Sequence, residues 1–280
     1  MSGIEPADFI AFPRGFRLGT TSFILPDHII PNVIRLGPFF DEIELLVFES
    51  APSDVLPSKA EVNTLLSLAR DLNLTYNIHL PTDVSLSHES PRKRQAAADT
   101  LLRVMDRLHP LAPTTHTLHL EMPTDVIRDM GNPEKRKDWL DCTREGLSAF
   151  LSGIPDTSAI SVETLDYPFS CIEPLIHEFH LSVCLDAGHQ IRCGHDLIQT
   201  FEAHRPRIPL IHLHGVDGSG PEKRDHKALD LLSQDEILKV LRVLENFRGA
   251  VSLEVFNLEN LNRSLRVLSG YFQGIASAIQ

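Results

Sequence analysis

The sequence predicts an α/β fold in which eight parallel strands close into a (β/α)8 barrel, or TIM barrel. Short runs of β-branched and apolar residues alternate with amphipathic helical segments, the pattern of a parallel sheet with crossover helices. This unit recurs often enough along the 280 residues to close a barrel. No linker rich in Pro, Ser or Gly divides the chain, so residues 1–280 are expected to form a single domain.

The elements follow from the residue pattern along the chain. The expected strands, in order, are Arg17–Phe23, Glu42–Phe48, Thr75–Leu80, Thr115–Glu121, Ile160–Leu165, Ser182–Ala187, Leu210–His214 and Val251–Phe256. Apolar residues at helical spacing predict helices over Ser58–Leu72, Arg92–Leu108, Lys137–Leu151, Ile172–Phe179, Ser233–Phe247 and Leu258–Ile275. An open doubly wound sheet would carry a glycine-rich turn after its first strand, and none is present. The Gly215–Gly220 stretch lacks the spacing of a phosphate-binding loop and is expected to be a flexible loop.

The composition excludes several classes of protein. Lys and Arg number 26 against 38 Asp and Glu, a net charge of −12, which argues against duplex nucleic acid and anionic membranes as partners. No run reaches the roughly 18 apolar residues of a membrane helix, and no signal peptide is evident. The scattered cysteines form no C-x-x-C pair, which argues against a metal knuckle or a thioredoxin-like motif: Cys142, Cys171, Cys184 and Cys193. Free thiols in a chain of this size fit a reducing compartment, so we expect a cytoplasmic protein.

Strand alternation predicts which side chains point into the barrel. Six consecutive strands place an acid or an imidazole inward, near the carboxyl ends where barrel enzymes build their sites. These residues are His79, His119, Glu163, Asp186, His212 and Glu254. Each one alone would be explained as a hydrogen-bonded or ion-paired interior residue. Together they would need several buried cationic partners, and these strands carry no inward Lys or Arg. Divalent cations would offset the cost of burying them, so the sequence predicts metal binding.

Several further residues lie beyond the regular strands. His189 follows Asp186 by three residues, a spacing that favours a ligand over a loop cap. His214, at the end of its strand, shares the inward parity of His212 but is expected to hydrogen-bond within its loop. His226 is either a ligand or a surface residue, and Glu49 faces inward only if its strand twists. The remaining histidines are expected on helix faces or in solvent: His28, His88, His109, His116, His177, His180, His195 and His204.

Three sequence features resemble the xylose-isomerase-like barrels that include endonuclease IV: Leu185-Asp-Ala-Gly-His, His212-Leu-His-Gly and the late Glu254. The resemblance implies a first metal at His79, His119 and Glu163, and a second held by Glu163 as a bridge with Asp186, His212 and Glu254. It implies a third at His189 and His226 with an Asp. In the endonuclease pattern that Asp stands two residues before the His, where this chain has Arg224, with Asp225 adjacent instead.

A narrower resemblance lies in Leu18-Gly-Thr-Thr-Ser-Phe, Pro31-Asn-Val, Glu42-Ile-Glu-Leu-Leu-Val-Phe-Glu and Asp225-His-Lys-Ala-Leu. These motifs resemble phosphodiesterases that remodel cobamides, the cobalamin-like cofactors, by opening their nucleotide loop. The resemblance implies a hydrolase that acts on a cobamide or other small phosphodiester, with two or three divalent ions per chain. Zinc is the first expectation, with manganese or iron as alternatives. Glu163, Glu254 and Asp186 are the expected catalytic residues.

Two other functions fit the same residues. A sugar isomerase or epimerase of this barrel type would use Glu163, Asp186, His212 and Glu254 around one metal, with carboxylates that transfer protons. Such an enzyme does not require His79 and His119. A non-catalytic corrinoid or metal binder on the same barrel is the third possibility, because fold alone does not define function.

Overall fold

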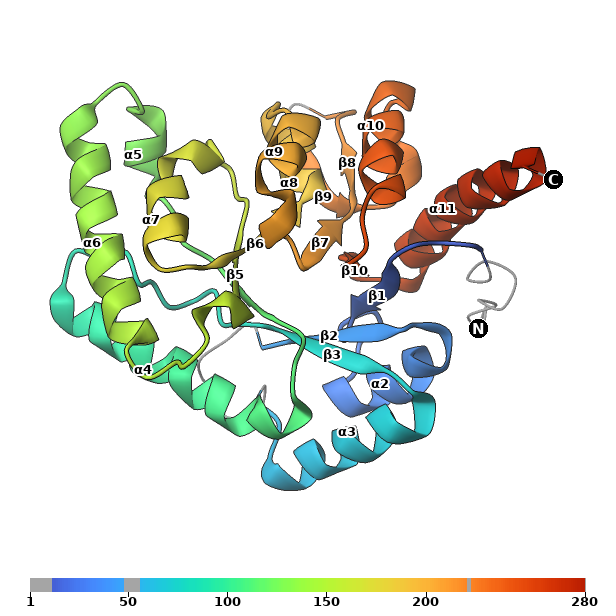
Figure 1. Cartoon of the computed structure of the whole chain (residues 1–280), viewed down its shortest axis with the longest axis horizontal. Helices are drawn as coiled ribbons and strands as arrows, with labels where there is room; N and C mark the ends of the chain where they lie inside the picture. The colour runs from blue at the N-terminus through green and yellow to red at the C-terminus, as the bar shows by residue number, and fades with distance from the viewer. Residues whose placement is uncertain (1–11, 48–55, 221–222, 280) are drawn as a thin grey trace.

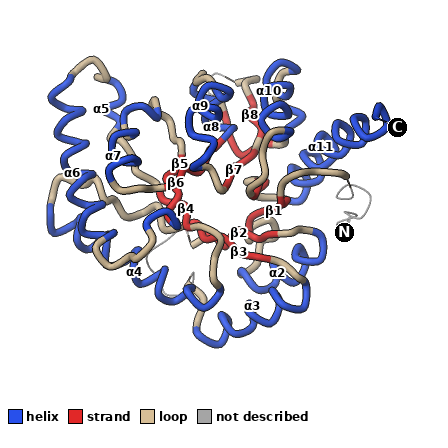
Figure 2. Tube along the Cα trace, viewed as in Figure 1, coloured by secondary structure: helices blue, strands red, loops and turns tan. Residues whose placement is uncertain are grey.

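The chain forms a closed barrel of eight parallel strands in the residues described by this computed structural model, which are 12–47, 56–220 and 223–279. The strands, in the order in which they neighbour one another, are β1 (Arg17–Thr21), β10 (Ala250–Leu253), β7 (Leu210–Leu213), β6 (Ser182–Asp186), β5 (Ile160–Glu163), β4 (His116–Leu118), β3 (Thr75–His79) and β2 (Glu42–Leu46). Figure 2 shows the strands at the centre and the helices outside them. The predicted TIM barrel is confirmed.

Helices follow the strands and cover the outside of the barrel (Figure 1). They are α2 (Ile29–Leu36), α3 (Lys59–Leu72), α4 (Pro91–Leu108), α5 (Thr124–Arg128), α6 (Pro133–Leu151), α7 (Glu173–Glu178), α8 (Ala187–Cys193), α9 (Leu197–His204), α10 (Gln234–Glu245) and α11 (Leu258–Ile279). The sequence periodicity missed α2, α5, α8 and α9, since helices this short show little more than two turns of pattern. Among the described helices, none has the length and apolar character needed to cross a bilayer.

A hairpin replaces the flexible loop expected after the seventh strand. β8 (Gly215–Asp217) pairs antiparallel with β9 (Arg224–Lys227), so the loop prediction for Gly215–Gly220 is wrong at its start. A Cβ atom on Gly215 would lie 1.9 Å from the carbonyl oxygen of Ala228, so only glycine permits this close backbone approach. The hairpin holds Asp225 and His226 in ordered structure directly after β7, and β7 carries His212.

His116 is buried, contrary to the expectation of a helix-face or solvent position. Its side chain lies on the outer side of β4, where it lines a pocket with Leu102, Met105 and Ile154 and is only 7 % exposed. Burial lowers the pKa of His116 to about 4. His116 does not reach water because helices cover the outer face of β4.

This burial predicts an acid-sensitive contribution to stability. Above pH 6.5 the imidazole is neutral in both the native and unfolded chain, and it contributes no pH dependence. Between pH 6.5 and about 4 only the unfolded chain takes up the proton, so native stability falls as pH falls. We expect the free energy of unfolding to drop between pH 7 and 5 by about 2 kcal/mol more in the wild type than in His116→Leu. If urea titrations gave the wild type and His116→Leu the same loss of unfolding free energy between pH 7 and 5, the lowered pKa of His116 would be wrong.

Candidate metal centre

The six side chains expected to point inward meet at the carboxyl ends of the strands. His79, Glu163 and Asp186 are the last residues of β3, β5 and β6. His119 and Glu254 directly follow β4 and β10, while His212 is the penultimate residue of β7 and stands in register with Asp186. Because the carboxyl ends of all eight strands open on one face of the barrel, these groups converge there.

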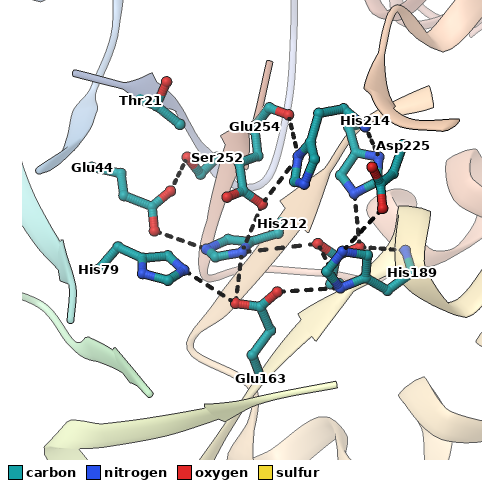
Figure 3. Close-up of polar contacts among 12 residues, drawn as sticks. Thr21, Glu44, His79, Glu163, His189, His212, His214, Asp225, Ser252 and Glu254 are labelled. Atoms are coloured by element: carbon teal, nitrogen blue, oxygen red, sulfur yellow. Dashed lines mark hydrogen bonds and ion pairs between the residues drawn. The ribbon is translucent and has the colours of Figure 1, made fainter. Parts of the chain in front are cut away.

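Several imidazoles surround Glu163, and Figure 3 shows its contacts with His79, His189 and His212. Its Oε2 atom is 2.9 Å from His119 Nε2 and 3.4 Å from His79 Nε2. The same oxygen is 3.4 Å from His212 Nδ1, while Oε1 is 3.4 Å from His189 Nδ1. Glu163 is 1 % exposed, so four imidazoles surround one buried carboxylate.

Two groups of residues that share Glu163 have the composition of metal sites. In each group every residue offers a ligand atom, and these atoms lie within 4.8 Å of one another. One is the His79–His119–Glu163 group, and the other is the four-residue group of Glu163, Asp186, His212 and Glu254. Cys184 also lies near Glu163 and His212, and burial raises the pKa of its thiol to about 12. The ligand roles implied by the sequence remain predictions that this geometry supports.

Unsatisfied polar atoms at the centre fit bound cations. Buried polar atoms in proteins normally have hydrogen-bond partners. Here several of the converging atoms have none among the described residues: Asp186 Oδ2, His189 Nδ1, His212 Nδ1, His214 Nε2 and Glu254 Oε2. All five belong to the lone-pair donors that zinc, manganese and iron bind. The residues therefore fit divalent metal ions.

The electrostatics of the centre also fit bound cations. Burial disfavours the charged form of Glu163, but His119 and His212 outweigh it and hold the carboxyl pKa well below its usual value. Burial also opposes the charged form of His119 and His189, yet adjacent carboxylates raise their pKa values to about 9 and about 10. In the metal-free protein, protons on the imidazoles thus balance the acids. Ligands must lose such protons to bind a metal, so cations would take over this role.

The remaining predicted residues lie on one side of the centre. His189 stands on α8, with Nδ1 3.6 Å from Asp186 Oδ2. His226 Nδ1, on β9, is 3.8 Å from Glu254 Oε2. Asp225 contacts the centre only through His189, at 3.8 Å, and its Oδ2 atom accepts a hydrogen bond of 2.5 Å from Arg192. All nine predicted metal-site residues are thus brought together, with Asp225 at the margin. Glu49 lies outside the described residues.

Glu44 is a site residue that the sequence reasoning missed. It lies on β2, is fully buried, and accepts a hydrogen bond of 2.8 Å from His212 Nε2 at its Oε1 atom. Ser252 Oγ donates to the other oxygen at 2.6 Å. With Nε2 protonated, His212 presents the lone pair of Nδ1 to the four-residue group. Alternation with Ile43 and Leu45 indicates an inward position for Glu44, whereas the only candidate named in this strand was Glu49.

Replacing Glu44 tests this orienting role. Carboxylates behind a ligating histidine typically contribute 10- to 100-fold to metal affinity. We expect Glu44→Ala to weaken Zn²⁺ binding by a factor in that range, roughly 10 to 100, as measured by calorimetric titration of metal-free protein. Glu44→Gln keeps an acceptor for His212 Nε2–H and should recover part of the loss. An affinity unchanged in Glu44→Ala would show that Glu44 does not orient the ligand.

Comparison with known proteins places this barrel in a family. The family model described as "Xylose isomerase-like TIM barrel" matches residues 32–271. The chain belongs to this family. A search among curated protein sequences finds no significant match. The superfamily part of the sequence resemblance is thereby confirmed, whereas the narrower cobamide-remodelling resemblance remains a hypothesis.

Similar solved structures are mostly sugar epimerases. A D-tagatose 3-epimerase-like protein superposes with a TM-score of 0.70 at 16 % identity, over 94 % of this chain and 100 % of that chain. D-Psicose 3-epimerase from Clostridium cellulolyticum H10 gives 0.67 at 13 % identity, over 91 % and 99 % of the two chains. The 3-keto-D-glucoside 4-epimerase from E. coli gives 0.63 at 13 % identity, over 92 % and 99 %. At such identities the likeness extends to the fold alone.

Proposed function

We propose that this xylose isomerase-like barrel is a metal-dependent phosphodiesterase. The observation that carries the proposal is the sharing of Glu163 between the His79–His119–Glu163 group and the four-residue group. A carboxylate with metal ligands on both sides suits two neighbouring ions, the arrangement used for displacement at phosphorus. A centre for one ion would need only the four-residue group, and would leave His79 and His119 without a chemical role.

The side chains of the centre have distinct tasks in this reaction. Divalent ions bound there would stabilise charge on the phosphoryl oxygens and lower the pKa of the attacking water. Glu163 would fix the spacing of the two groups, and His212 is held in place by Glu44. His212 and His226 lower the pKa of Glu254 to about 2 despite burial, so its carboxylate stays ionised and could serve as a metal ligand. Once the imidazoles have lost their protons to become ligands, bound cations would also offset the charges of Glu163, Asp186 and Glu254, which would otherwise repel a phosphodiester anion.

The proposed substrate is the nucleotide loop of a cobamide. The N-terminal motifs and the Asp225-His-Lys-Ala-Leu run support this choice by their resemblance to cobamide-remodelling phosphodiesterases. Water would attack phosphorus, one P–O bond would break, and the products would be a phosphomonoester and an alcohol. Mass spectrometry of a cobamide incubated with metal-loaded protein in H₂¹⁸O should show one ¹⁸O in the phosphomonoester. Tight binding without cleavage would instead identify a corrinoid-binding protein and overturn the proposal.

An aromatic pair beside the centre supports a large substrate. Phe23, directly after β1 and Ser22, is 50 % exposed, and its ring packs 6.4 Å from that of Phe256. The Phe256 ring in turn lies 4.9 Å from the ring of His226. An exposed phenyl group next to a polar centre offers apolar area to a ligand wider than the reacting phosphate.

Truncation of Phe23 separates recognition from chemistry. Full burial of a phenylalanine side chain contributes about 1.5–3 kcal/mol, and a ligand could cover only the exposed half of Phe23. We therefore expect Phe23→Ala to raise KM for a cobamide roughly 3- to 10-fold. Its kcat for a small diester such as bis(4-nitrophenyl) phosphate should remain at the wild-type value. An equal loss on both substrates would remove Phe23 from substrate recognition.

Sugar epimerisation around one metal is the second candidate. It is favoured by the four-residue group, which suffices for one ion, and by the solved structures similar to this chain. An epimerase exchanges a carbon-bound hydrogen with solvent through its carboxylates. Deuterium incorporation into a ketose in D₂O, undiminished in His79→Ala and without phosphodiester cleavage, would establish this function in place of ours.

A further inference from the structure

We propose that His189, His214 and His226 bind a metal ion through three imidazoles, and that Asp225 is outside the ligand set. This three-histidine site differs from the set implied by the sequence, in which an Asp accompanies His189 and His226 and His214 only supports its own loop. The inference rests on the metal requirement of the proposed function but not on its substrate.

The three rings face one another beside the four-residue group. Each offers a nitrogen atom, and these atoms lie within 4.8 Å of one another. The ring centroids of His214 and His226 are 4.3 Å apart, and His189 lies 5.4 Å from the first and 5.7 Å from the second. His214 is fully buried, and neither its Nε2 nor His189 Nδ1 has a hydrogen-bond partner among the described residues. Both nitrogens face carboxylate oxygens, His214 Nε2 at 3.2 Å from Asp186 Oδ1 and His189 Nδ1 at 3.4 Å from Glu163 Oε1. A cation bound among these lone-pair donors would satisfy the nitrogens and the carboxylates together.

Backbone carbonyl groups orient two of the rings for ligation. His214 Nδ1 is 3.1 Å from the carbonyl oxygen of Gly215, and His226 Nδ1 is 3.1 Å from that of Glu254. An imidazole that donates Nδ1–H to a carbonyl group leaves the lone pair of Nε2 for a metal. The backbone N–H of His226 also lies 3.0 Å from His214 Nδ1. That contact requires a proton on Nε2, so binding a metal through His214 Nε2 moves the proton to Nδ1, keeps the hydrogen bond to Gly215 and gives up the contact with the His226 N–H.

Asp225 is engaged elsewhere. The hydrogen bond from Arg192 to its Oδ2 atom is 2.5 Å long, and the same oxygen is 3.8 Å from His189 Nε2. A carboxylate that is paired with a guanidinium group is a weaker electron-pair donor to a cation. His214, which comes directly after β7, occupies the interior position instead.

Two backbone features hold these rings in place. A Cβ atom on Gly188 would lie 2.0 Å from Cε1 of His214, so the absence of a side chain at this position makes room for the ring. His226 has φ 51°, in the left-handed region that non-glycine residues seldom occupy. Such strain clusters at binding and catalytic sites, where the surrounding structure maintains it. Both features serve the orientation of an imidazole.

The donor set defines the class of ion. Neutral imidazoles suit Zn²⁺, Fe²⁺ and Co²⁺ better than Mg²⁺ or Ca²⁺. Three protein ligands leave a coordination position open, which is typical of catalytic rather than structural zinc sites. Asp186 lies between this site and the four-residue group: Oδ1 is 3.2 Å from His214 Nε2, and Oδ2 is 4.0 Å from His212 Nδ1. An ion here would therefore neighbour the four-residue group.

Titration of metal-free protein with Co²⁺ tests the assignment without any substrate. The number of ions bound and the visible absorption of Co²⁺ are measured for the wild type, His214→Ala, His226→Ala and Gly188→Ala, with Asp225→Asn as the matched variant. We expect the first three variants each to bind about one equivalent less than the wild type, while Asp225→Asn binds the full number. Gly188→Ala alters no ligand, so its loss would report the displacement of His214. Thermal unfolding verifies that each variant is folded. The His226 side chain is 24 % exposed, so its truncation leaves no fully buried cavity.

The outcomes separate the alternatives. A full complement of ions in His214→Ala, or a loss of one ion in Asp225→Asn, overturns the three-histidine site. A wild type that binds this extra ion but does not cleave a cobamide overturns the proposed substrate and leaves the site standing.

Discussion

Replacing Glu163 with glutamine is expected to reduce phosphodiester hydrolysis by on the order of 10³-fold or more. The carboxylate is shared by two groups of candidate ligands, so its loss removes a charge from both at once. Interactions of metal ions with transition-state charge supply several kcal/mol, and each ~1.4 kcal/mol corresponds to a factor of ten in rate. The amide retains the shape of the side chain, which limits the structural perturbation. The measurement is kcat on a small diester and on a cobamide, at saturating metal.

A matched variant controls for the loss of one carboxylate. Glu202 lies on the exposed face of α9, away from the centre, and Glu202→Gln should hydrolyse both substrates at the wild-type rate. If Glu163→Gln retained the wild-type rate as well, the shared-carboxylate mechanism would be wrong. The metal content of Glu163→Gln is determined in parallel. Loss of ions would show that Glu163 is needed for metal binding, whereas an inactive variant that keeps its ions would show that Glu163 is needed for the reaction itself.

Metal binding is expected to raise the thermal stability of the protein substantially. In the described part of the chain, five buried nitrogen and oxygen atoms of the centre have no hydrogen-bond partner. A ligand that binds them only in the native state stabilises that state by mass action. At free Zn²⁺ about 1,000 times its Kd, this linkage amounts to about 4 kcal/mol. For a chain of this size, such a gain corresponds to a rise in Tm of roughly 8–16 °C.

Calorimetric scans with Zn²⁺ and with a chelator measure this difference. The same scans on His212→Ala should show a smaller response to Zn²⁺, because His212 belongs to the four-residue group. A Tm that does not change with metal would contradict the account, since the unpartnered atoms would then have no cation to bind.

The sequence predicted much of the centre because regular strands impose strict alternation. His79, Glu163, Asp186 and His212 stand on strands whose other parity is apolar, so a period of two suffices to place them inside. The family resemblance supplied the roles for residues beyond the strands. The same alternation places Glu44 of β2 inside the barrel between the outward Ile43 and Leu45.

The remaining features depend on tertiary context. His214 shares the inward parity of His212, but the room that Gly188 leaves for its ring and the neighbouring His189 and His226 come from other elements. The β8–β9 hairpin has very short strands and a glycine at its start, so its composition resembles that of a loop. The pairing of Asp225 with Arg192 joins residues from α8 and β9, which no local pattern reveals. The burial of His116 likewise requires knowledge of the helices that cover β4.

The most direct test of the account is the metal content of the protein after loading with Zn²⁺ and removal of loosely bound ions. Elemental analysis should find two or three tightly held ions per chain, because the shared Glu163 joins two groups of ligands and a third lies beside them. Less than about one ion per chain would contradict the central claim that cations stabilise these converging acids and imidazoles.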